Sequence, residues 1–138
     1  GDQNVDLVIA SNAKGEPMLL GFGNTDAALD ANTTALALAR IAIGMLKPSG
    51  GLTLAEIVAA IKTAPDYSLL QMAILTALTK GNAPVQEPDV VAKLLLVRNA
   101  AKSALADLII LRSGVPGAKK AAALEISLPP TRKPSVDS

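Results

Sequence analysis

The hydrophobic half of this sequence is almost entirely aliphatic. Of the 138 residues 50% are hydrophobic, yet Phe22 and Tyr67 are the only aromatic side chains, and His, Cys and Trp are absent. A chain of this length fits one domain and buries about two thirds of the surface that its unfolded form exposes. We therefore expect a single helix-rich domain over residues 1–128, which folds without disulfides or metals. Residues 129–138 are polar and contain proline, which is typical of a tail or linker.

The missing residue types exclude most familiar active sites. Histidine is the usual general base, and histidine and thiolates are common metal ligands. Asp26 and Asp30 form a close acid pair before a helix, a position where carboxylates usually act as caps or dipole partners. Thr33 and Thr34 have no histidine to activate them. We expect no catalytic residue, no cofactor and no metal site. An enzyme is the third alternative, and it would have to use Asp, Glu, Lys, Ser, Thr, Arg or Tyr67.

The first part of the chain predicts a β-hairpin. Two short apolar runs, Val5–Ala10 and Met18–Gly23, flank a turn-rich interval. In that interval Asn12 and Gly15 have the spacing of a type I turn closed by a glycine bulge.

The next segment predicts a helix that is apolar on almost every side. It is expected to begin at Asn32 or Thr33 and to run to Leu46, before Pro48. A helix of this kind is usually central in its domain. Its charged residue Arg40 is expected to reach an edge or a carboxylate.

Three further helices follow, and local signals mark where each begins and ends. The expected boundaries are a capping box at Thr53 and Glu56, Pro65 after the second helix, Asp66 as the cap of the third, Gly81 as its left-handed stop, and Pro88 at the first position of the fourth, which runs to about Arg112.

The fourth helix carries a seam with large side chains at its ends and alanines at its middle. Small residues at the middle let another helix approach closely. We favour this seam as the packing line within the domain, and the alternative is the face of a homodimer or of another protein partner. Its residues are Leu94, Val97, Ala101, Ala104 and Leu108.

Near the end of the chain, Leu124–Leu128 alternates in the manner of a half-exposed strand. A third strand beside the hairpin would relieve the marginal stability of two strands alone. The expected fold is α+β and mainly α, with an N-terminal hairpin, about four helices around an apolar central helix, and a possible C-terminal third strand.

Three segments carry a family resemblance: Val5–Ile9, Asn12–Phe22 and Thr33–Leu38. Together they resemble the N-terminal region of uncharacterised exported bacterial proteins, including proteins assigned as lipoproteins. The likeness covers the first third of the chain. It implies an exported protein, periplasmic or at the cell surface, of unknown role, and it supplies no site residues.

Charge and hydropathy narrow the range of partners. Lys and Arg number 13 against 12 Asp and Glu, for a net charge of +1 without a basic patch, so nucleic acid is not expected. The most apolar stretch, Val90–Leu111, contains Lys93, Arg98, Lys102 and Asp107, which argues against a transmembrane helix. The sequence favours a non-enzymatic structural or protein-interaction domain. The alternative is a domain that binds an apolar or lipid-like ligand between its helices.

Overall fold

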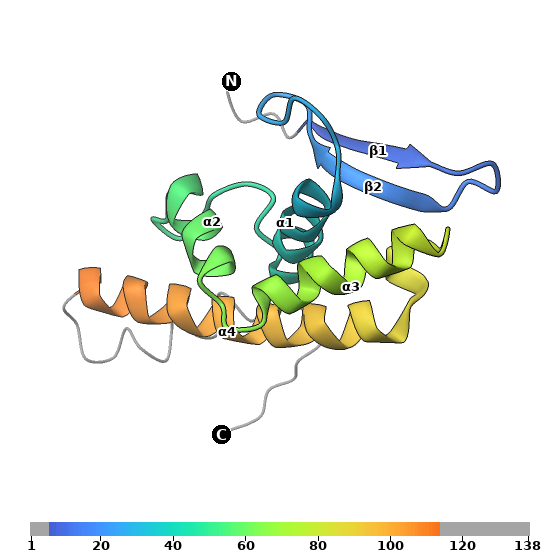
Figure 1. Cartoon of the computed structure of the whole chain (residues 1–138). Coiled ribbons are helices and arrows are strands. Elements are labelled where there is room, and N and C mark those ends of the chain that lie inside the picture. Colours follow the sequence, from blue (N-terminus) through green and yellow to red (C-terminus); the bar gives the residue numbers. More distant parts are fainter. Residues whose placement is uncertain (1–5, 114–138) are drawn as a thin grey trace.

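A computed structural model describes residues 6–113, in which an antiparallel hairpin is followed by four α-helices (Figure 1). This confirms the predicted fold class, α+β and mainly α. The expected strand at 124–128 and the tail at 129–138 lie outside the described residues. The elements are β1 (Leu7–Ser11), β2 (Pro17–Phe22), α1 (Ala31–Ile43), α2 (Leu54–Lys62), α3 (Tyr67–Thr79), a short 3-10 helix η1 (Pro84–Gln86) and α4 (Pro88–Ser113).

The hairpin turn is closed by Asn12 and Gly15. The Asn12 side-chain oxygen accepts the Lys14 N–H at 2.9 Å, and the Asn12 carbonyl accepts the Gly15 N–H at 2.9 Å. Gly15 has a φ of 81°, which a residue without a Cβ adopts readily. The predicted turn glycine is therefore confirmed, and the strand register shifts between Ala10 and Ser11, just before the turn.

Helix α1 lies at the centre of the fold, as predicted, with β2, α2, α3 and α4 packed around it (Figure 1). The predicted ends of this helix were wrong. Asp30 is the N-cap, because its carboxylate accepts the Thr33 N–H while the Thr33 hydroxyl accepts the Asp30 N–H, each at 2.9 Å. Gly44 ends the helix with a φ of 75°, short of the expected Leu46.

The remaining helix boundaries follow the local signals. Thr53 and Glu56 form the predicted capping box, and Gly81 has the predicted positive φ, 77°. Pro88 is the first residue of α4. Asp66 occupies the predicted N-cap position of α3, but its side chain makes no capping hydrogen bond.

The core consists of aliphatic side chains from every helix. Its largest fully buried members include Ile57, Ile61, Leu70, Ile74 and Leu105. These residues come from α2, α3 and α4 and share the core with buried alanines of α1. The interior is therefore filled mainly by aliphatic side chains, with the Phe22 and Tyr67 rings also buried in it.

Arg40 is a charged residue within this interior. It is 6% exposed, and its guanidinium carbon lies 4.1 Å from the centre of the Phe22 ring. Its Nε donates to the Met45 carbonyl at 3.3 Å, and Nη2 donates to the Leu46 carbonyl. Arg40 thus ties the chain after α1 to the end of β2 through carbonyl groups and a ring, whereas the sequence predicted that it would reach an edge or a carboxylate.

Candidate functional site

A pocket of about 320 Å³ opens between the start of α1, the end of α2 and the first turns of α3. Sequence reasoning considered Asp26 and Thr33 for chemistry but did not place them with residues of α2 and α3. The lining residues are Asp26, Asn32, Thr33, Leu36, Lys62, Tyr67 and Gln71.

Much of the polar lining is already committed to hydrogen bonds within the fold. The Asp26 carboxylate accepts the Phe22 N–H at 2.6 Å, and the Thr33 hydroxyl donates to the Leu20 carbonyl at 2.7 Å. The Gln71 amide donates to the Asn32 side-chain oxygen at 2.7 Å, which joins α3 to α1. These groups hold the elements around the pocket together.

Two further groups at the pocket are Tyr67 and Lys62. Tyr67 is 7% exposed, and burial raises the pKa of its phenol, with Asp30 acting in the same direction. The phenol is therefore neutral at neutral pH and cannot serve there as a base. A phenol and an ammonium group can donate hydrogen bonds to a small ligand. The lining residues do not combine a nucleophile with a base that would activate it.

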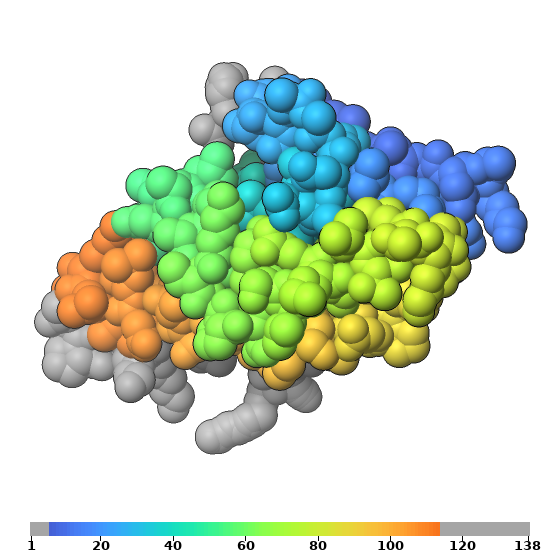
Figure 2. All heavy atoms as spheres, viewed as in Figure 1, coloured from blue at the N-terminus to red at the C-terminus, as the bar shows by residue number. Residues whose placement is uncertain are grey.

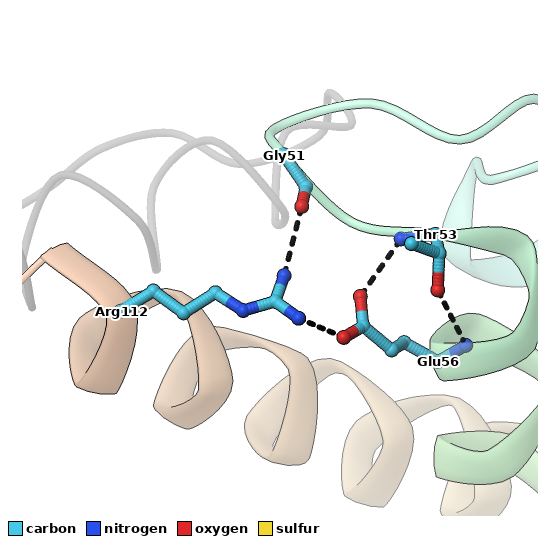
Figure 3. A network of polar contacts seen from close by, with 4 residues as sticks. All are labelled: Gly51, Thr53, Glu56 and Arg112. Atoms are coloured by element: carbon cyan, nitrogen blue, oxygen red, sulfur yellow. Dashed lines mark hydrogen bonds and ion pairs between the residues drawn. The ribbon is translucent and has the colours of Figure 1, made fainter.

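Arg112, near the C-terminal end of α4, forms a second polar cluster with residues at and before the start of α2 (Figure 3). Its Nη1 donates to the Gly51 carbonyl at 2.8 Å, and its Nη2 pairs with the Glu56 carboxylate. The same carboxylate accepts the Thr53 N–H at 2.8 Å through its other oxygen. The cluster fastens the end of α4 to the start of α2, which is a structural role.

The seam predicted on α4 divides between the interior and the surface. Val97 and Ala101 are buried, Leu94 and Leu108 are partly buried against the core, and Ala104 is exposed. Leu105, which the predicted seam left out, is fully buried. Most of the seam therefore packs inside the domain, and Ala104 is the member that faces outward.

The exposed side of α3 is a feature that the sequence analysis missed. From Tyr67 to Thr79 this helix has no charged residue. Leu69, Met72 and Leu75 are 44%, 63% and 58% exposed. Their spacing of three places them on one side of the helix, which we call the α3 face. Figure 2 shows α3 (yellow-green) lying across the visible surface, in front of α4.

Neither a metal centre nor a membrane span is found in the described part of the chain. Residues 6–113 contain no group of three or more acidic side chains placed to hold an ion. None of their helices is both long and apolar enough to cross a bilayer.

Comparisons with known proteins give no further assignment. No family model, no curated protein and no solved structure matches this chain. Its function is therefore inferred from its own residues.

Proposed function

We propose that this chain is a non-enzymatic protein-interaction domain that binds a helix of another protein along the α3 face. The observation that carries the proposal is the exposure of Leu69, Met72 and Leu75 on a helix that has no charged residue. Large apolar side chains that share one side of an uncharged helix are normally covered, so their exposure indicates a surface that a partner covers.

The energetics favour burial of this face by an apolar partner. Removing apolar surface from water contributes about 25 cal/mol per Å². Contiguous exposed apolar side chains on a folded domain are the usual mark of a binding surface. Residues spaced by three along a helix fit the apolar stripe of a partner helix, as in helix-in-groove recognition. Because the α3 face is uncharged, the partner is expected to present a neutral, apolar stripe.

The polar pocket supports neither an enzyme nor a lipid-binding protein. Asp26 and Thr33 are bonded to the backbone of β2, so their polar groups are occupied by the fold. Leu36 is the one aliphatic residue among those that line the pocket. Sites for apolar ligands are lined mainly by hydrophobic side chains. Protein binding at α3 is therefore favoured over a ligand held between the helices.

The proposal is tested by site-specific photocrosslinking of the full chain in its own cells. A photoreactive residue replaces Met72 in the α3 face, and the control replaces Ser103, an exposed residue of α4. We expect one discrete adduct with a defined protein from position 72. The adduct is expected to disappear when Leu69→Lys and Leu75→Lys are added to the same chain.

Circular dichroism of the purified variants is the control for folding. Because Leu69 and Leu75 are exposed, we expect the lysine variants to keep the wild-type spectrum and thermal midpoint. An adduct that forms equally from position 103, or that survives both lysine substitutions, would contradict the proposal.

A further inference from the structure

The two edges of the hairpin differ in how their backbone groups are paired. On the outer edge of β2, the Leu20 N–H donates to the Thr34 hydroxyl at 3.0 Å, and the Leu20 carbonyl accepts from Thr33. The Phe22 N–H donates to the Asp26 carboxylate at 2.6 Å. Side chains from α1 and the segment before it therefore close this edge.

The outer edge of β1, by contrast, is not closed by other groups of residues 6–113. This follows from the hydrogen-bond pattern between β1 and β2. Leu7 lies opposite Phe22 and Ile9 lies opposite Leu20. Because Leu20 and Phe22 direct their N–H groups away from β1, these are the non-hydrogen-bonded pairs of the ladder. The backbone groups of Leu7 and Ile9 must then point away from β2. Within residues 6–113 no hydrogen bond joins them to another group.

Strand β1 also lacks the features that protect an exposed edge. Leu7–Ser11 contains no charged residue and no proline, and its register shift lies at the Ser11 end. Ile9 shares a face of the sheet with the buried Leu20, yet it is 49% exposed. Figure 1 shows the reason, since β2 lies between β1 and the helices and leaves β1 on the outside.

We propose that β1 pairs antiparallel with β1 of a second copy of this chain, so that two hairpins form one continuous sheet. The two-fold axis passes between the two Ile9 residues, which places Val8 of each copy opposite Ala10 of the other. This register brings the outward backbone groups of Ile9 in the two copies together. The symmetric pair uses a surface distinct from the α3 face and goes beyond the proposed function.

Charge and shape favour a second copy of this chain as the partner of the β1 edge. In this register Asp6 of each copy lies opposite Asn12 of the other, so no like charges face each other across the new ladder. The strand is apolar on both of its faces from Leu7 to Ala10. Each Ile9 would cover the exposed side of the other, which is an isologous contact with matching surfaces.

The register makes a specific prediction for substitutions at Ile9. Because Ile9 faces itself across the axis, Ile9→Lys places two like charges opposite each other, and so does Ile9→Glu. Each variant of the full chain is expected to dimerise at least about tenfold more weakly than the wild type in sedimentation equilibrium. A mixture of the two variants is expected to form a one-to-one heterodimer. Met72→Lys, which alters the α3 face instead, is the matched control and keeps the wild-type dimer.

Each outcome of this experiment decides the proposal. A wild-type chain that stays monomeric at millimolar concentration would overturn it, as would Ile9→Lys and Ile9→Glu variants that dimerise as the wild type does. A dimer lost on Met72→Lys but retained by both Ile9 variants would place self-association on the α3 face and would overturn pairing through β1. Failure of β1 pairing leaves crosslinking at position 72 unaffected, so the two proposals fail separately.

Discussion

Tyr67 is a buried phenol, and as the only tyrosine of the chain it can be titrated directly. Burial raises its pKa, and Asp30 adds to the effect. The folded state therefore keeps this proton to higher pH than the unfolded state does. This difference in pKa between the two states contributes to the free energy of unfolding. The contribution is fully present below the unfolded pKa of about 10 and is lost as the pH rises through the folded pKa.

We predict that the phenolate absorbance of the folded chain appears above the pH at which an exposed tyrosine ionises. Above a pH of about 10, the free energy of unfolding of the wild type should fall more steeply than that of Tyr67→Phe, because only the wild type carries this proton. Urea unfolding across the alkaline range measures the difference. Titration at the ordinary tyrosine pKa, or parallel stability profiles, would show that the phenol is not held in a buried environment.

Single residues also show where sequence reasoning reached its limit. The carboxylate of Asp30 and the hydroxyl of Thr33 can each cap a helix, so the sequence alone offers several starting points for α1. The choice is set by tertiary bonds, because Thr33 and Thr34 also hold Leu20, which lies 13 and 14 positions earlier. The partners of Arg40 are also set by tertiary structure. After Gly44 ends α1, the following residues place the Met45 carbonyl within hydrogen-bond distance of the Arg40 guanidinium.

At the scale of elements, the junction of β2 with α1 depends on Thr34. This residue is fully buried, and its hydroxyl is the partner of the Leu20 N–H at 3.0 Å. Thr34→Val keeps the shape of the side chain but leaves a buried donor without a partner, which costs about 1–3 kcal/mol. Thr76→Val on the exposed side of α3 is the matched control, with an expected change below about 0.5 kcal/mol. Equal losses in urea unfolding would contradict the role of Thr34 in closing the strand edge.

At the junction of α2 and α4, substitutions of Glu56 distinguish the contribution of a helix cap from that of a surface ion pair. Glu56 caps Thr53 and also pairs with Arg112, whose side chain is 43% exposed. Glu56→Gln retains an acceptor for the Thr53 N–H and loses only the screened ion pair, for an expected cost of at most about 0.5 kcal/mol. Glu56→Ala loses the cap as well and should cost about 1 kcal/mol. Chemical denaturation compares the two, and identical losses would mean that the cap contributes nothing.

Elements with local signals were the predictable part of the fold. The Thr53–Glu56 box, Gly81 and Pro88 each act within about one helical turn, so the sequence pattern carries the information directly. The pocket could not be predicted in this way. Its walls join residues as distant as Asn32 and Gln71, which are 39 positions apart, and helical periodicity does not say which helices meet.

At the scale of the whole molecule, the α3 face contributes little to closing the core. Leu70, Ala73, Ile74 and Ala77 of the same helix supply its buried side, while Met72 is 63% exposed. The absence of charge from Tyr67 to Thr79 was visible in the sequence. Its meaning depends on knowing that one side of α3 remains uncovered, which only the packing of the helices reveals.

The most direct test of the interaction role is the dissociation constant of the protein that crosslinks at position 72, measured calorimetrically with the full chain. Leu69→Lys combined with Leu75→Lys should weaken binding at least about 100-fold, since buried apolar anchors dominate interface energies. Because the α3 face is uncharged, wild-type affinity should change little between low and high salt. Unchanged affinity in the double variant, or wild-type binding that disappears at high salt, would contradict docking on the apolar side of α3.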